Sequence, residues 1–86
     1  MSANLFMEYT GRNGQWYRKE LPIALPNKFM ANLRELADYD YPWNLRPIDV
    51  PVLETLATIC REDKKSIAVL IATVKKHGEV RLDAEF

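Results

Sequence analysis

The sequence predicts a single α+β domain with the element order ββαααβ, in which an antiparallel sheet packs on three helices. Three observations support this fold class. Asn13-Gly14 separates two strand-like segments, two later segments repeat apolar residues at helical spacing and a third ends in residues typical of a helix C-terminus, and residues 79–86 alternate polar and apolar side chains. A chain of 86 residues encloses only one hydrophobic core, so we expect one domain covering residues 1–86.

The first two elements are predicted to form a β-hairpin. Residues 4–9 and 15–21 are rich in aromatic and aliphatic side chains, and they flank the turn segment 10–14. The Asn-Gly pair in this turn tolerates the positive φ that a tight turn demands. Residues 22–26 begin and end with proline, which suits the interior of neither a strand nor a helix, so they are expected to be a connector.

The next two elements are predicted to be amphipathic helices. Asn27 is a candidate cap for the first helix, whose apolar spacing continues to about Tyr39. Residues 40–47 contain two prolines and break the period, which indicates a loop. Asp49 precedes Val50-Pro51, a plausible first turn because proline lacks the N–H that would be unsatisfied there, and the second helix runs to about Cys60.

The third helix is the most apolar part of the chain. Residues 61–65 form a charged turn, and Asp63 or Ser66 can cap the helix that follows. Ile67 to Val74 is almost wholly apolar and is compatible with a buried strand, but Lys75-Lys76-His77-Gly78 is typical of a helix C-terminus and favours a helix. We therefore expect a central, buried helix that is inaccessible over Ile67 to Val74. The last segment then forms a half-buried strand that joins the N-terminal hairpin.

Composition limits the class of protein. Hydrophobic residues make up 48% and charged residues 28%, the values of an ordinary folded domain. The longest apolar run, Ile67 to Ala72, is far shorter than the roughly 18 residues of a membrane span. Cys60 has no partner for a disulfide and no signal peptide is visible, so we expect a cytoplasmic protein in a reducing compartment, with no membrane association.

Candidates for catalysis are scarce in the sequence. The one histidine, His77, stands beside a helix-ending glycine, and no glycine-rich phosphate loop, CxxC or HExxH motif occurs. We therefore expect no catalytic residues, no metal site and no cofactor, and we do not expect an enzyme. His77 itself is expected to serve as a helix-end residue.

The segment Leu56–Cys60 followed by Ser66–Asp83 resembles the helix, turn, recognition helix and first wing strand of winged helix-turn-helix transcription regulators. The resemblance covers the last third of the chain. In that family the first wing strand returns through a loop to a second strand, whereas this sequence reaches Phe86 within the first. The resemblance implies a DNA-binding regulator that uses the third helix.

The same resemblance implies particular site residues. Lys64, Lys65 and Ser66 would lie at the phosphate-facing start of the recognition helix. Ala68, Val69 and Thr73 would fall where base-reading side chains lie, but alanine and valine make no bidentate bonds to bases, so the implied readout is not sequence-specific. The full nucleic-acid-binding set predicted here is Lys64, Lys65, Ser66, Thr73, Lys75, Lys76 and Arg81.

The charge distribution leaves the function of these lysines open. The net charge of the chain is zero, but residues 61–82 carry six Lys/Arg against three Asp/Glu. Lysines at both ends of the third helix form a patch that binds phosphates, or they are the solvated ends of a buried helix. The sequence does not choose between these alternatives.

A second hypothesis involves a protein partner. Tyr39, Tyr41 and Trp43 surround Pro42 beside acidic residues, and exposed aromatic side chains anchor protein interfaces. The loop then acts in a protein-binding module or inhibitor, or it folds back as a lid on the core. Trp16 and Tyr17 point to opposite faces of a strand, so one of them is expected to be exposed. Such surplus apolar surface also predicts self-association as a homodimer.

Overall fold

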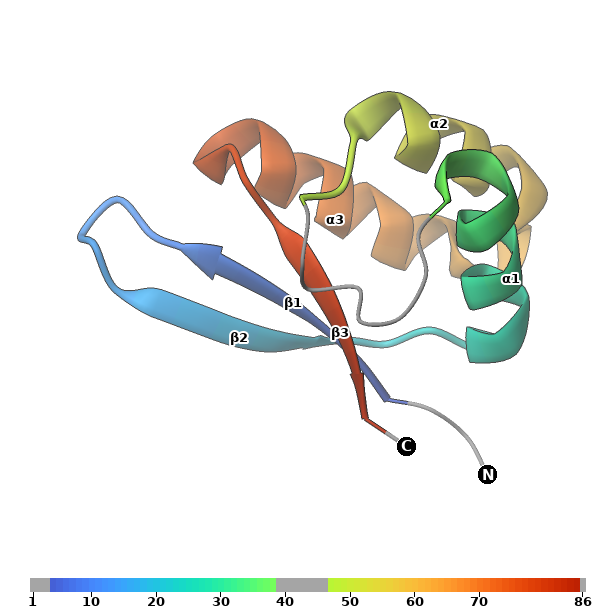
Figure 1. Cartoon of the computed structure of the whole chain (residues 1–86), viewed down its shortest axis with the longest axis horizontal. Coiled ribbons are helices and arrows are strands. Elements are labelled where there is room, and N and C mark those ends of the chain that lie inside the picture. The colour runs from blue at the N-terminus through green and yellow to red at the C-terminus, as the bar shows by residue number, and fades with distance from the viewer. Residues whose placement is uncertain (1–3, 39–46, 86) are drawn as a thin grey trace.

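The computed structural model describes residues 4–38 and 47–85. The elements are, in chain order, β1 (Asn4–Thr10), β2 (Trp16–Leu21), α1 (Pro26–Ala37), α2 (Val50–Ile59), the 3-10 helix η2 (Arg61–Asp63), α3 (Lys64–His77) and β3 (Arg81–Glu85) (Figure 1). They form one compact α+β domain in the predicted order ββαααβ. Within the described ranges, no helix combines the length and the apolar character needed to cross a lipid bilayer.

The three strands form one antiparallel sheet in the order β2-β1-β3. β1 lies in the middle, with Tyr9 opposite Tyr17 of β2. On its other side β1 pairs with β3, so that Asn4 lies opposite Glu85. The last strand therefore joins the N-terminal hairpin, as the sequence predicts.

The hairpin turn has the conformation expected of its Asn-Gly pair. The Gly11 N–H donates to the Gln15 carbonyl at 2.8 Å, and Asn13 Oδ1 accepts from the Gln15 N–H at 3.1 Å. Gly14 has a φ of 80°, which glycine adopts without the steric cost of a Cβ. The hairpin prediction is confirmed.

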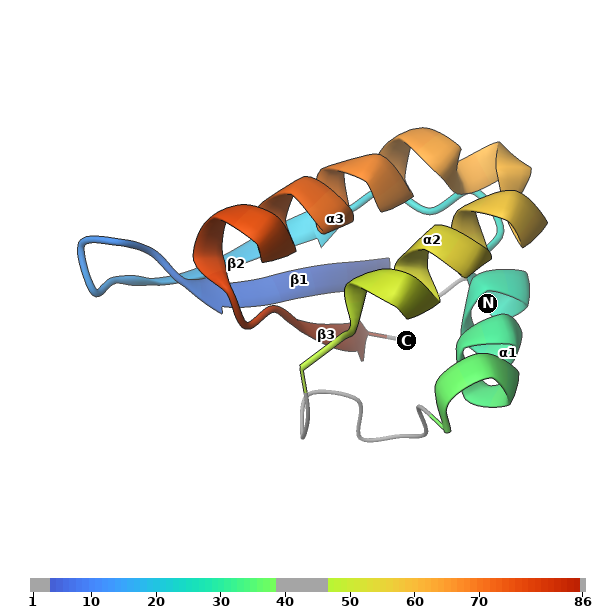
Figure 2. The same cartoon turned by 90° about the horizontal axis from the view of Figure 1, so that it is seen from above.

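All three helices lie on the same side of the sheet (Figures 1 and 2). Alternate residues of β1 are buried beneath them, whereas Phe6 and Glu8 point to the opposite face, which no described helix covers. We call this second side the open face of the sheet. The core between sheet and helices contains Leu5, Met7, Tyr9, Leu21, Phe29, Leu33, Ile48, Leu53, Leu56, Cys60, Ile67, Leu70, Val80 and Leu82.

α3 is partly exposed, so the prediction that Ile67 to Val74 are inaccessible is wrong. Ile67 and Leu70 are fully buried in this stretch, but Val69 is 52% exposed. The helices form a single layer over the sheet, and α3 packs on β1 below and on α2 beside it. A helix in such a layer keeps one side in water, because no other described element lies above it.

The helix starts differ from the predictions in their capping. α1 begins at Pro26, after an N-cap residue, Leu25, whose side chain offers no acceptor, so Asn27 is not the cap. α1 ends at Ala37, where Asp38 adopts a φ of 54°, and the predicted end at Tyr39 lies outside the described residues. α2 follows Asp49 as predicted, although that side chain makes no capping hydrogen bond.

The carboxylate of Asp63 binds the backbone of the connector that precedes α1. Asp63 is 3% exposed, and its side chain accepts hydrogen bonds from the N–H groups of Ala24 and, at 3.3 Å, Leu25. Ser66 Oγ donates to the carbonyl of Pro22. The prediction that one of these two side chains caps α3 is wrong, because the helix has no side-chain capping hydrogen bond. Both instead tie the start of α3 to the connector that leads into α1.

Asp63→Ala is expected to lower the free energy of unfolding by about 2 kcal/mol, because two backbone N–H groups lose a charged acceptor. Urea denaturation measures the change. The matched control is Glu62→Ala, which removes an exposed neighbour ion-paired with Lys28 at 3.4 Å and should cost at most about 1 kcal/mol. Equal losses in the two variants would contradict the role assigned to Asp63.

Candidate nucleic-acid interface

The described cations divide into those that are ion-paired and those that are not. Arg18 contacts carboxylates of β1 and β3, Lys28 pairs with Glu62, and Arg81 pairs with Glu79 at 3.7 Å. A second group forms no ion pair with any described carboxylate and gathers at α3, the turn before it and the hairpin: Arg12, Lys19, Arg61, Lys64, Lys65, Lys75 and Lys76. Positive charge is thus concentrated around α3.

α3 presents a continuous exposed surface without negative charge. Its 14 residues, KKSIAVLIATVKKH, include no carboxylate. At 100° per residue the exposed side chains fall within an arc of about 140°. We call this surface the outer face of α3, and it consists of Lys64, Lys65, Ala68, Val69, Ala72, Lys75 and Lys76.

The two lysine pairs lie at opposite ends of the outer face. Lys65 and Lys75 are ten residues apart, which corresponds to about 15 Å along the helix axis. Between them stand only the small side chains of Ala68, Val69 and Ala72, so another molecule can approach the helix backbone closely. The outer face therefore has a pair of lysines at each end and only small apolar side chains between them.

The helix dipole distinguishes the two lysine pairs. Lys75 and Lys76 lie in the last turn, before Gly78 ends the helix with a φ of 88°, and cations there stabilise the helix. Lys64 and Lys65 begin the helix, where the dipole favours anions and a cation is unfavourable. Helix stability therefore accounts for the second pair but not for the first.

The seven residues predicted to bind nucleic acid fall into three groups. Lys64, Lys65, Lys75 and Lys76 all lie on the outer face. Two hydroxyls make intramolecular hydrogen bonds: Ser66 donates to Pro22, and Thr73 Oγ donates to the Val69 carbonyl at 2.8 Å. Arg81 points to the open face of the sheet, in register with Glu8 of β1. The structure thus brings together four of the seven.

A second cationic cluster, which the sequence analysis missed, lies where the hairpin approaches the end of α3. An open groove of about 390 Å³ is lined there chiefly by Tyr9, Arg12, Tyr17, Lys19, Lys76 and His77. We call it the hairpin-end groove. Its described lining includes no carboxylate. Lys76 belongs both to this groove and to the outer face of α3, so the two cationic surfaces are continuous.

Stacked rings form the floor of the hairpin-end groove. The centroids of Tyr9 and His77 are 4.5 Å apart, and those of Tyr9 and Tyr17 are 5.5 Å apart. Lys19 Nζ lies 5.9 Å and 5.8 Å from the centroids of the two tyrosine rings. His77 Nδ1 is shielded from solvent without a hydrogen-bond partner among the described residues. Burial lowers the pKa of His77, and the charges of Lys76, Arg12 and Lys19 lower it further.

Negative charge gathers on the opposite side of the molecule. On the open face, Arg18 binds Glu8, Asp83 at 2.7 Å and Glu85 at 2.8 Å. The same guanidinium lies 4.2 Å from the centroid of the Phe6 ring. Hydrogen bonds to Asp83 and Glu8 raise the pKa of Arg18, so it stays charged throughout the physiological range. Arg18 neutralises only part of this carboxylate cluster.

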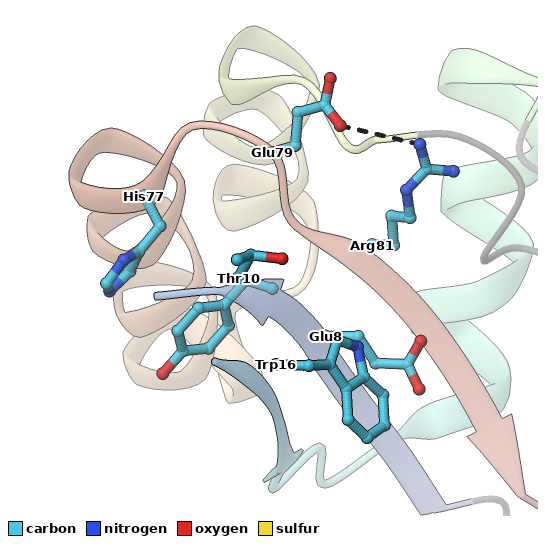
Figure 3. A pocket seen from close by; sticks show the side chains of 7 residues that line it. Glu8, Thr10, Trp16, His77, Glu79 and Arg81 are labelled. Carbon is cyan, nitrogen blue, oxygen red and sulfur yellow. Dashed lines mark ion pairs between the residues drawn. The ribbon is translucent and has the colours of Figure 1, made fainter. Parts of the chain in front are cut away.

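A recess of about 280 Å³ lies at the edge of the open face and is lined by Glu8, Thr10, Trp16, His77, Glu79 and Arg81, together with Tyr9 (Figure 3). Its charged side chains already form ion pairs within the protein, because Glu79 turns toward Arg81 and Glu8 pairs with Arg18. Trp16 is 62% exposed and Tyr17 is half-buried, as expected from their opposite directions on β2. The recess therefore has less unsatisfied charge than the hairpin-end groove.

The predicted protein-binding residues, Tyr39, Tyr41 and Trp43, lie outside the described residues. In the described ranges, no group of three His, Cys, Asp or Glu side chains is arranged to hold a metal ion. Comparisons with protein-family models, curated proteins and solved structures find no match to this chain. A function is therefore inferred from the arrangement of side chains on a ββαααβ domain.

The lowered pKa of His77 has a consequence for stability. The folded protein takes up a proton at this site less readily than the unfolded chain, in which the histidine has a pKa of about 6.5. The free energy of unfolding is therefore expected to fall as the pH drops below that value. His77→Gln should remove this dependence, as measured by urea denaturation between pH 5 and 8. Parallel curves for the two proteins would contradict the assignment.

Proposed function

We propose that this domain is a DNA-binding regulator of the helix-turn-helix kind that contacts duplex DNA through the outer face of α3. One observation carries the proposal: four lysines that form no ion pair with a described carboxylate stand at the two ends of α3, a partly exposed helix that contains no carboxylate. Support comes also from the order α2, η2, α3 and β3, which follows the helix, turn, helix and strand of the resemblance noted above.

The dimensions of the outer face suit the major groove of DNA. That groove is about 12 Å wide and admits an α-helix. Lysine pairs about 15 Å apart along the helix axis would reach phosphates on both sides of it. The small side chains of Ala68, Val69 and Ala72 would allow the helix to enter without steric conflict.

The chemistry of the same face favours sequence-tolerant binding. Ala68, Val69 and Ala72 offer only apolar contacts, such as those made to a thymine methyl group. The Thr73 hydroxyl is bonded to the Val69 carbonyl. Affinity would then come mainly from phosphate contacts, which places the dissociation constant in the range of about 1–100 μM at physiological salt.

The carboxylates of the open face would orient the domain on DNA. The strand register places them on the face of the sheet that is turned away from the helix layer. DNA would repel that side and attract the lysines of α3, so α3 would lead during the encounter. This local concentration of lysines would allow a chain of zero net charge to bind a polyanion.

Binding of a fluorescent DNA duplex, followed by anisotropy, tests the proposal. Affinity should fall steeply with salt, with a slope of log K against log salt of about −0.9 per phosphate contacted. Lys64→Ala with Lys65→Ala should flatten the slope by about 2, and Lys75→Ala with Lys76→Ala should do the same. Sedimentation of the free protein supplies the oligomeric state needed to fit the curves.

Lys28→Ala is the matched control, because Lys28 is an exposed lysine of α1 that pairs with Glu62. It should leave both affinity and slope nearly unchanged, as should Trp43→Ala. Absence of DNA binding at low salt would overturn the proposal. So would an effect of Lys28→Ala as large as that of the α3 variants. A loss confined to Trp43→Ala in assays with a protein partner would support the alternative hypothesis of a protein-binding module.

A further inference from the structure

The hairpin-end groove brings together cations from three separate parts of the chain. Arg12 comes from the turn between β1 and β2, Lys19 from β2, and Lys76 from the end of α3. None of the three forms an ion pair with a described carboxylate. Like charges held together without a counter-charge repel one another, so an anion in the groove would relieve an unfavourable arrangement.

We propose that the hairpin-end groove binds a phosphate group and that His77 takes up a proton when the phosphate binds. The proposal depends on the proposed function only for the source of the phosphate. That source is the backbone of DNA bound along α3, or a free phosphate ion or ester.

The surroundings of His77 explain why the two events are coupled. On its own helix it faces Lys76, and from the hairpin it faces Tyr9, Arg12, Tyr17 and Lys19. On the side of the recess, Glu79 turns toward Arg81 and away from His77, and Glu8 pairs with Arg18 (Figure 3). The free groove thus disfavours a positive imidazole ring, whereas a bound phosphate would supply the missing negative charge.

Continuity with α3 favours a phosphate over other anions. Lys76 lies on both surfaces, so the groove extends the row of lysines beyond the C-terminal end of the helix. A DNA strand that contacts Lys75 and Lys76 would pass the mouth of the groove at Arg12 and Lys19. Successive backbone phosphates could then occupy the outer face and the groove together.

The coupling between protonation of His77 and phosphate binding fixes the direction in which pH changes the affinity. If a bound phosphate raises the pKa of His77, then lowering the pH strengthens binding by the same coupling. Over the range where His77 titrates, log K should change with pH with a slope of up to about one, for uptake of one proton. A phosphodiester keeps its single negative charge across this range, so the slope reports on the protein.

NMR of the His77 ring tests the proposal directly, because His77 is the single histidine in the sequence. Its Hε1 resonance is titrated between pH 5 and 8 in the full chain, with inorganic phosphate, with sulfate as an anion of constant charge, or with sodium chloride at matched ionic strength. We expect phosphate and sulfate to raise the pKa of His77 saturably, above any rise in sodium chloride. Equal rises in all three salts would overturn the proposal, since screening alone would then explain them.

Variants separate the groove from general charge effects. Arg12→Ala and Lys19→Ala change exposed side chains, and each should weaken the phosphate-induced rise, whereas Lys28→Ala should not. Amide spectra verify that the variants are folded. A rise of unchanged size in Arg12→Ala with Lys19→Ala would also overturn the proposal.

A DNA duplex forms the last arm of the experiment and distinguishes the two proposals. A raised pKa of His77 on addition of duplex identifies backbone phosphate as an occupant. If inorganic phosphate acts and the duplex does not bind, the groove serves a free phosphate or ester and the DNA-binding proposal fails. If the duplex binds with a steep salt dependence but neither the duplex nor inorganic phosphate changes the titration of His77, the groove proposal fails and the function proposed for α3 stands.

Discussion

The buried carboxylate of Asp63 links parts of the chain that are far apart in sequence and that also share the hydrophobic core. It accepts hydrogen bonds from two N–H groups in the connector between β2 and α1, while its own backbone leads directly into α3. Ser66 reinforces the same junction through Pro22. The hairpin, the first helix and the third helix are thereby joined at one point. The position of the outer face of α3 relative to the sheet depends on this junction.

The separation of charge follows from the layered architecture. A sheet covered on one side only has two different surfaces, and the alternation of side chains along each strand assigns residues to one or the other. Arg18, Glu8 and Asp83 share the open face because the register of three neighbouring strands points their side chains to the same side of the sheet. The unpaired lysines lie on the helix side or at its ends. The zero net charge of the chain therefore includes a local excess of lysine on α3 and a local excess of carboxylate on the open face.

Local patterns in the sequence were sufficient to predict most of the fold. Asn13-Gly14 marked the turn, Gly78 marked the end of α3, and the alternation after Val80 marked β3. The exposure of α3 was missed because its outer face carries Ala68 and Val69, which a hydropathy pattern does not distinguish from core residues. The contact of Asp63 with the connector before α1 was missed because the two segments are far apart in the sequence.

The candidate site was predictable only where its residues are close in sequence. Lysines at the two ends of one helix are visible as a pattern, and the structure places them on one surface. The hairpin-end groove combines Arg12 and Lys19 with His77, and no short-range pattern links the hairpin to the end of α3. Only the length of the hairpin and its register beneath α3 bring these residues together.

The central position of β1 affects how the chain folds during synthesis. β1 is the first strand to leave the ribosome, but one of its two edges is covered by β3, which is made last of the described elements. Until residues 81–85 emerge, β1 and β2 form a two-stranded ribbon with an unpaired apolar edge, and such ribbons are marginally stable and prone to wrong pairing. The three-stranded sheet thus forms only after all three helices have been made.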